Sequence, residues 1–242
     1  PSTLGKKVVR IFEYLDKYLI KLYLHPIIFI NYTIAQQVAS KLTIFSNAIT
    51  SVLLPNLARQ KNIKNKRKVL NLHLLIFYIP IGLFLIIGGE FFDDILRWWL
   101  RDNFNNNFYQ LFNIFIALTF IASKSHIIIS LYEANEITKK NSIIETFTII
   151  PFFIFLIILI YKENVMLICY LILAKEILVF IIRSFIIKKY LISYGLYLSS
   201  ISLFLITWFS KINEINELYM IAKILFFISI LLLIYNAYKQ IK

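Results

Sequence analysis

The 242-residue chain has one cysteine, five glycines and five prolines. A single thiol, Cys169, cannot form a disulfide framework or a thiolate metal cage. Glycine and proline this scarce exclude the collagen-like, linker-like and disordered classes. The three histidines, His25, His73 and His126, are too scattered along the sequence to predict a metal site. We therefore expect neither a metal nor a cofactor.

Motifs of the common catalytic and nucleotide sites are also missing. The sequence contains no P-loop (G-x-x-x-x-G-K-[ST]), no H-E-x-x-H and no G-x-S-x-G. The adjacent carboxylates Asp93 and Asp94 fall in a stretch that we expect to be an exposed loop, where solvation is their ordinary role. No set of residues predicts a catalytic centre, so we expect that the chain is not an enzyme.

Acidic residues are half as frequent as basic ones, 13 against 26, which gives a formal net charge of +13. In a nucleic-acid-binding protein, such an excess gathers on a polar surface beside aromatic stacking platforms. Here the basic residues lie mostly in short gaps between apolar runs, the pattern that fixes the cytoplasmic loops of membrane proteins. We therefore expect no nucleic-acid partner.

Apolar residues dominate the composition. They make up 60% of the chain, against roughly 45–50% in soluble proteins. Charged residues are 16% and the mean hydropathy is +0.75. A soluble protein of this size could not hide so many apolar side chains from water, so the sequence predicts a membrane protein.

We predict an all-α fold, a polytopic membrane helix bundle with eight spans. Crossing about 30 Å of hydrocarbon takes roughly 20 mostly apolar residues, and no segment shows the period-2 alternation of a membrane β-strand. Two fairly polar segments, 8–24 and 29–57, are long enough to span. The more apolar spans are expected at 69–90, 108–131, 142–161, 165–187, 194–210 and 218–238.

The basic residues favour an even number of spans with both ends of the chain cytoplasmic. If eight spans alternate, most of the basic residues fall on one side of the membrane. That side would hold Lys6, Lys7, Arg10, the acid-free run from Arg59 to Lys68, Lys139, Lys140, Arg183, Lys188, Lys189, Lys239 and Lys242. The opposite loops are nearly neutral, and Trp98 and Trp99 in one of them suit the headgroup zone.

A polar stripe runs along the predicted helix 29–57. Its members recur at spacings of 3 and 4, which places them on one helix face. They are Thr33, Gln36, Ser40, Thr43, Asn47 and Thr50, widened by Asn31, Gln37 and Lys41. Such a stripe could join two helices through small hydroxyls, but two glutamines and a lysine favour a hydrated cavity.

Other polar groups recur inside the predicted spans. The span 108–131 carries a second stripe next to Lys124, made of Thr119, Ser123, His126, Ser130 and, at the cytoplasmic end, Glu133. His126 could carry a proton, or it could simply donate to a neighbouring helix. Lys175 and Glu176 are sequence neighbours that point about 100° apart on a helix, so we expect each to need a partner elsewhere.

Within the spans, basic groups slightly outnumber acidic ones. A cavity lined in this way would attract an anion such as the phosphate of a lipid, for which lysine acts as a point charge. Lys17, Lys41, Lys124 and Lys175 are our candidates for that role. Gln36, Gln37, Ser40 and Asn47 are the candidates for hydrogen bonds to sugar hydroxyls.

Several short segments carry a resemblance to a known family. The run Tyr14–Ile20 fits Y-x-D-[RK]-x-[IL]-[IL], and further along stand Tyr32–Ala35, Gln37–Ala39, Asn47–Ala48 and Leu54–Pro55. These segments resemble the seventh and eighth helices of lipid-linked oligosaccharide flippases, the O-antigen and polysaccharide exporters of the multidrug/oligosaccharidyl-lipid/polysaccharide superfamily. Two later segments are similar to the same family, Ile95–Leu100, with Arg101 where glycine is usual, and Ala134–Asn135 with Lys139–Lys140.

The resemblance covers roughly residues 11–190. It implies that residues 1–190 are the carboxyl-terminal six-helix lobe of a two-lobed transporter, followed in 191–242 by two additional transmembrane helices. It also implies that the amino-terminal lobe lies upstream, which fits a chain that opens with Pro1 and has no secretory signal. Asp16 and Lys17 match the family's charged pair, and Tyr32 and Gln37 match cavity-facing polar positions.

The function implied is the flipping of an undecaprenyl-pyrophosphate-linked glycan repeat unit from the cytoplasmic to the outer leaflet of a bacterial inner membrane, by alternating access. Asp16 and His126 are the candidates for coupling this movement to an ion gradient. The expected partners are the lipid-linked glycan, membrane lipids and the missing lobe, and a glycan polymerase would fit beside them. The alternatives are a drug/cation antiporter of the same superfamily, which would favour acidic cavity groups, and a membrane glycosyltransferase or polymerase, which usually needs a larger outer loop.

Overall fold

The computed structural model of the chain describes residues 17–101, 104–190, 201–202, 204–209 and 216–241. About 92% of the structure is helical, and no strand occurs within these ranges, so the predicted all-α class is confirmed. The helices are α2 (Pro26–Ser40), α3 (Thr43–Arg59), α4 (Ile63–Gly88), α5 (Phe92–Leu100), α6 (Asn106–Ala134), α7 (Thr138–Tyr161), α8 (Val165–Ile186) and α10 (Asn216–Ile241). Short 3₁₀ turns, η1 (Gly89–Phe91) and η3 (Lys188–Tyr190), follow α4 and α8.

Within the described ranges, four elements are long and apolar enough to cross a membrane. They are Pro26–Arg59, which joins α2 to α3, and the helices α6, α7 and α8. This composition is compatible with a membrane protein, whereas the expected arrangement of six spans plus two is not established. Residues 17–23 are helical. Residues 8–16 of the predicted span 8–24, and residues 194–200, 203 and 210 of the predicted span 194–210, lie outside the described ranges.

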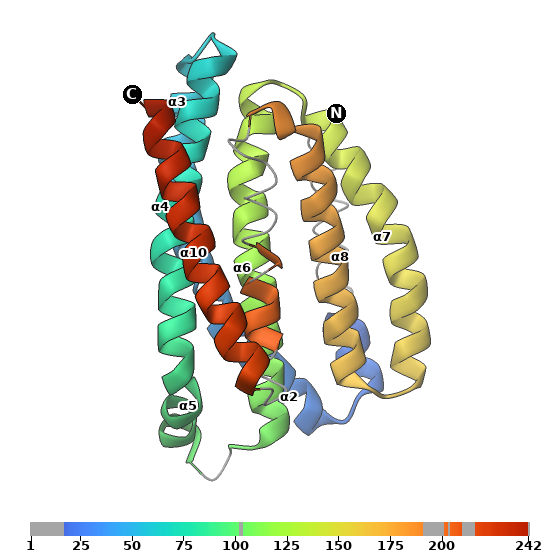
Figure 1. Cartoon of the computed structure of the whole chain (residues 1–242). Coiled ribbons are helices and arrows are strands. Elements are labelled where there is room, and N and C mark those ends of the chain that lie inside the picture. Colours follow the sequence, from blue (N-terminus) through green and yellow to red (C-terminus); the bar gives the residue numbers. More distant parts are fainter. Residues whose placement is uncertain (1–16, 102–103, 191–200, 203, 210–215, 242) are drawn as a thin grey trace.

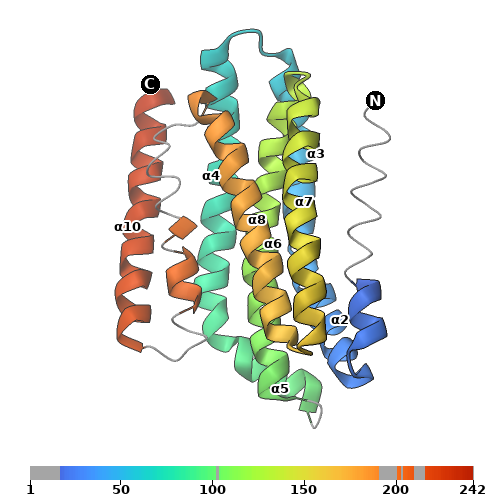
Figure 2. The same cartoon turned by 90° about the vertical axis from the view of Figure 1, so that its right-hand side faces the viewer.

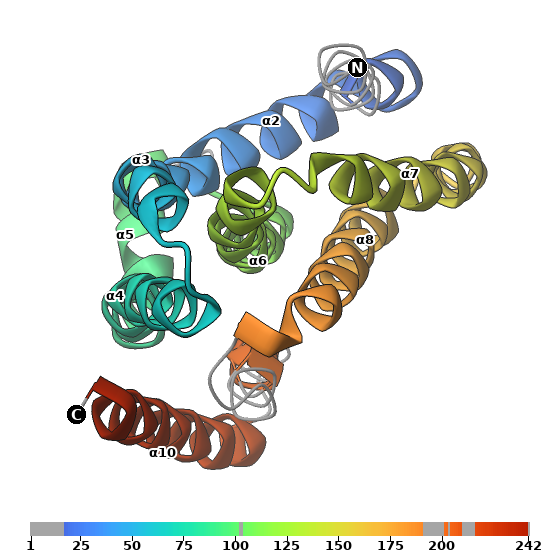
Figure 3. The same cartoon turned by 90° about the horizontal axis from the view of Figure 1, so that it is seen from above.

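Helix α6 is the centre of the bundle. It packs against α2 and α3 on one side and against α8 on the other, and Figure 3 shows it enclosed by these helices and α4. In its most apolar stretch, 78% of the residues are buried, against 33% in α7 and in α8. Helix α10 packs on α4 at the outside of the bundle (Figures 2 and 3).

The prediction of one continuous helix over 29–57 is wrong in one respect. The structure divides this segment into α2 and α3 at Lys41 and Leu42. At this break, the amides of Lys41 and Leu42 donate to carbonyls only three residues back, at 3.2 and 3.1 Å. The Ser40 and Thr43 hydroxyls also donate to backbone carbonyls, at 2.8 and 2.7 Å. Hydroxyls that compete in this way for backbone acceptors loosen an α-helix and bend it.

The outer surface of the bundle is apolar. Helix α7 presents large side chains that are more than half exposed. They include Ile143, Phe147, Ile150, Ile154 and Phe155. Water would not favour such a surface, and acyl chains would suit it.

The two ends of the bundle differ in charge. The turns α3–α4 and α6–α7 and the end of α8 lie at one end, at the top of Figure 1, and the turns α7–α8 and α4–α6 lie at the other. We call the first one the basic end and define it by its exposed basic residues. They are Arg59, Lys61, Lys64, Lys139, Lys140 and Lys188. The described basic groups predicted to share one side of the membrane therefore do lie together.

We predict that the two ends face opposite sides of a membrane. The native thiol of Cys169 is buried, so a Cys169→Ser background can carry single reporter cysteines. In sealed vesicles, an impermeant maleimide should modify Lys64→Cys and Lys140→Cys from one side only, and Lys162→Cys from the other side only. Modification of Lys64→Cys and Lys162→Cys from the same side would contradict this arrangement. Unmutated Cys169 should react only after denaturation.

Candidate functional site

A cavity of about 440 Å³ lies between the helical residues 17–23 and the helices α2, α6, α7 and α8. The apolar part of its wall includes Leu118 of α6 and Ile149 and Phe152 of α7. The polar part of the wall comes from Lys17, Gln36, Ser40, Thr43, Ser125, His126, Glu145, Lys175, Glu176 and Arg183. Three cations and two carboxylates therefore face one cavity, a formal excess of one positive charge with His126 neutral.

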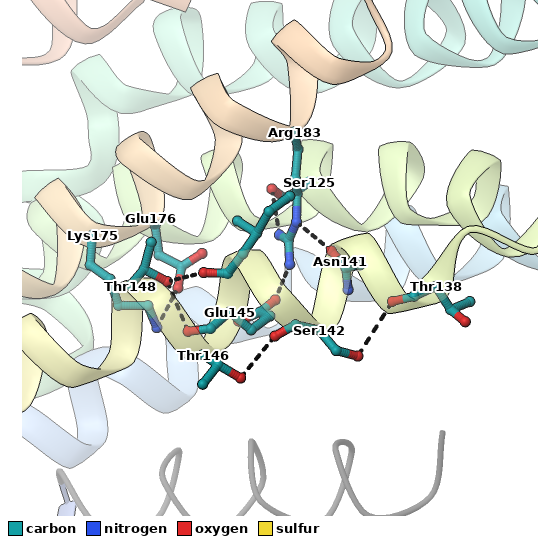
Figure 4. A network of polar contacts seen from close by, with 11 residues as sticks. Ser125, Thr138, Asn141, Ser142, Glu145, Thr146, Thr148, Lys175, Glu176 and Arg183 are labelled. Atoms are coloured by element: carbon teal, nitrogen blue, oxygen red, sulfur yellow. Dashed lines mark hydrogen bonds and ion pairs between the residues drawn. The ribbon is translucent and has the colours of Figure 1, made fainter. Parts of the chain in front are cut away.

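Arg183 is the most buried charged group of this wall, with 3% of its side chain exposed. Its Nε donates to Asn141 Oδ1 at 2.8 Å, and its Nη1 donates to Ser125 Oγ at 3.0 Å. Its Nη2 forms an ion pair with Glu145 (Figure 4). One guanidinium thus joins α8 to α7 and α6, which a planar group with several fixed donors does well.

A second ion pair lies deeper along α8. Lys175 Nζ is 2.9 Å from Glu176 Oε1, and it lies 5.4 Å from the centre of the Phe152 ring. Our expectation that these neighbours cannot satisfy each other is wrong. Both side chains are long enough to turn toward the cavity and meet there (Figure 4), although their Cβ atoms leave the helix in different directions.

Most hydroxyls near the cavity donate to backbone carbonyls of their own helices. On α7, Thr148 Oγ1 donates to the Ile144 carbonyl at 2.9 Å and Thr146 Oγ1 to the Ser142 carbonyl at 2.9 Å (Figure 4). On α2 and α3, Ser40 and Thr43 do the same. Because a hydroxyl has one donor and two acceptor sites, these oxygens can still accept a hydrogen bond from a ligand. The Gln36 amide can both donate and accept.

The structure brings together five of the site residues expected from the sequence. Lys17, Gln36, Ser40, His126 and Lys175 all line the cavity. They come from the helical residues 17–23 and from α2, α6 and α8, so only the fold makes them neighbours. Asp16, the partner of Lys17 in the resemblance, lies outside the described residues.

The other expected residues do not line this cavity. Gln37 on α2, Lys41 at the break and Asn47 on α3 are exposed elsewhere. Tyr32 is fully buried and meets Phe115 edge-on, with 4.9 Å between ring centres. Lys124 is fully buried as well, and its ammonium lies 4.1 Å from the centre of the Phe120 ring.

Three important residues of the wall were missed at the level of the sequence. From the sequence alone we place Arg183 among the basic residues of the cytoplasmic side, and we assign no role to Glu145 or Ser125. Spacing carries a usable signal, because Glu176 and Arg183 are seven residues apart and Asn141 and Glu145 four, so each pair shares a helix face. What spacing cannot give is the meeting of these two faces.

Comparison with known proteins leaves the family open, since no family model, no curated protein and no solved structure matches the chain. Within the described residues, no cluster of His, Cys, Asp or Glu could hold a metal ion. The wall offers three kinds of group that a ligand could contact. Cations attract an anion, amide and hydroxyl groups hydrogen-bond a polar ligand, and aromatic and aliphatic side chains contact its apolar part.

We predict that the buried pair Arg183–Glu145 holds the bundle together. Glu145→Ala would leave a buried guanidinium without its carboxylate, a change that costs about 3–5 kcal/mol. The pair Arg97–Asp93 is a matched control, because it spans 2.8 Å and its side chains are 56% and 35% exposed. Asp93→Ala should cost at most about 1 kcal/mol. Unfolding in a single detergent measures both, and equal losses would contradict the prediction.

Proposed function

We propose that this chain is a lobe of a membrane transporter that moves a lipid-linked glycan across the bilayer by alternating access. The observation that carries the proposal is the cavity, whose wall combines cations, amide and hydroxyl groups with apolar side chains. A lipid-linked glycan presents these three kinds of surface to a protein, namely a pyrophosphate, sugar hydroxyls and an acyl chain. The resemblance to oligosaccharide flippases supports the substrate class, an undecaprenyl-pyrophosphate-linked repeat unit.

Two cations of the wall would have to exchange a carboxylate for the phosphate of a ligand. Arg183 and Lys175 are each paired with a carboxylate of the same wall. An incoming pyrophosphate would compete with Glu145 and Glu176 for these two cations. The carboxylates would therefore neutralise the cations in the empty site and be displaced by the more highly charged anion. This exchange avoids a buried unpaired charge at either stage, which would be costly in an apolar bundle.

The volume of the cavity is consistent with half of a larger site. About 440 Å³ lies in the lower part of the roughly 300–1,000 Å³ range of ligand pockets. A pyrophosphate and part of a glycan would occupy it, and a second lobe would cover the remainder, as transporters built from two repeats do. The proposal places this lobe in a bacterial inner membrane with its basic end toward the cytoplasm, because basic loops are retained there.

A drug/cation antiporter fits the same wall less well. Such a transporter needs carboxylates that can meet the cationic drug or the coupling ion. In this cavity, both carboxylates are already paired with basic side chains, and the wall keeps an excess of positive charge. No observation in the described part of the chain favours this alternative over the glycan.

Neighbouring residues offer a sharp test of the proposal. Gln36 and Lys175 line the cavity, whereas Gln37 and Lys41 do not. In the organism that encodes the chain, Gln36→Ala and Lys175→Gln should lower surface glycan at least about tenfold, the loss expected for about 1.4 kcal/mol of binding. Gln37→Ala and Lys41→Gln should leave it within about twofold, at equal protein levels. Normal glycan display in the Gln36 and Lys175 variants would refute the assignment.

We also predict that His126 couples transport to a proton gradient. Its imidazole lines the cavity, and the unperturbed pKa of histidine, about 6.5, lies close to physiological pH. A protonophore should stop glycan export in cells with the native chain. In the His126→Gln variant, export should be slower and no longer respond to the protonophore. Native export that continues after collapse of the gradient would exclude proton coupling.

A further inference from the structure

The exposed basic residues of the basic end come from three separate segments of the chain. Arg59 ends α3, Lys61 lies in the α3–α4 turn and Lys64 lies in the first turn of α4. Lys139 and Lys140 belong to the first turn of α7, and Lys188 belongs to η3. The acidic residues within six positions of them in the sequence are Glu133, Glu136 and Glu145. Glu145 is paired with Arg183 in the cavity wall, which leaves two carboxylates against the six basic groups. The surface therefore carries a strong positive charge.

Helix α4 forms hydrogen bonds to the α6–α7 turn and to η3. Lys66 Nζ donates to Asn135 Oδ1 at 2.7 Å, which ties the start of α4 to the α6–α7 turn. Asn71 Nδ2 donates to the Tyr190 carbonyl at 2.8 Å, which ties the next turn of α4 to η3. The six basic groups thus belong to one braced surface rather than to three independent loops.

Three of the lysines lie at the positive amino-terminal ends of helices, where a basic side chain is unfavourable. The first turns of α4 and α7 contain no acidic residue, and Lys64, Lys139 and Lys140 lie at these amino-terminal ends instead. A helix amino terminus is itself positive, so basic side chains there are unfavourable and an anion is stabilised. Two helix ends and six basic side chains consequently favour the same kind of ligand.

Apolar exposure begins directly beside the charge. Ile143 is 56% exposed and Phe147 75% exposed, and they follow Lys139 and Lys140 within two turns of α7. Ile63 is 51% exposed and lies between Lys61 and Lys64. A dissolved anion would gain nothing from contact with these apolar side chains. A phospholipid carries a charged headgroup next to acyl chains, so it could contact the basic and the apolar side chains together.

We propose that the basic end is a binding surface for anionic phospholipids of the adjacent leaflet. The headgroup phosphate contacts the exposed lysines and the amino-terminal ends of α4 and α7, and the acyl chains lie along the exposed apolar side of α7. This surface is distinct from the cavity, and the inference does not depend on the transported substrate. It gives the basic residues a binding role in addition to their influence on orientation.

The experiment measures lipid affinity with the full chain in a neutral detergent. Phosphatidylglycerol and phosphatidylcholine are titrated separately and binding is followed by native mass spectrometry. We expect phosphatidylglycerol to bind at least about tenfold more tightly. The double variant Lys64→Gln, Lys140→Gln should weaken phosphatidylglycerol about tenfold or more, since each basic residue near a membrane surface contributes on the order of 1 kcal/mol.

The matched control removes the same charge from the opposite end. Lys21 and Lys162 are exposed there, and Lys21→Gln with Lys162→Gln should leave both affinities within about twofold. Equal weakening by the two double variants would overturn the proposal, because net charge alone would then explain it. Competition by dissolved glycerol phosphate at the same concentration as the lipid would overturn it too, since the surface would then serve a soluble anion. Unchanged melting temperatures show that the variants remain folded.

Discussion

Every polar group inside an apolar helix bundle has to find a partner, because neither acyl chains nor packed aliphatic side chains can replace water. This constraint explains the main polar contacts of the structure. Three guanidinium nitrogens of Arg183 meet acceptors on α6 and α7. The hydroxyls of α2, α3 and α7 donate to their own backbone. Where the polar side chains converge, the helices leave a cavity instead of closing on one another.

The same constraint shapes what the cavity can bind. Because the serine and threonine donors are used by backbone carbonyls, the hydroxyl oxygens offer acceptors, which suits a ligand rich in hydroxyl donors. Because Arg183 and Lys175 each have a carboxylate beside them, a ligand would need a strong negative charge to compete for these cations. In the transporter that we propose, a wall with three cations, two carboxylates and few hydroxyl donors would disfavour neutral apolar molecules and cations.

Local patterns in the sequence were sufficient for the all-α class and for part of the wall. The spacing of Gln36, Ser40 and Thr43 predicted one polar face, and all three line the cavity. The same spacing included Asn47, which is exposed and does not line the cavity. A periodic pattern assumes a straight helix, and this one is broken at Lys41 and Leu42. Lys124 and Lys175 are both lysines inside predicted apolar spans, so the sequence treats them alike. Lys124 nevertheless packs on Phe120 inside the bundle. Only the packing of α6 against α3 and α8 separates these lysines, and no local pattern contains that information.

Arg183 joins the two charged features of the molecule. It lies in the last turn of α8, directly before the basic end, and it also lines the cavity. Lys175 is eight residues earlier, which is about 12 Å along a helix axis. An anion arriving at headgroup level would meet the exposed lysines first, then the guanidinium, and then the deeper ammonium. Cations at successive depths lower the cost of drawing a charged group into an apolar bundle, because no step leaves that group without a counter-charge.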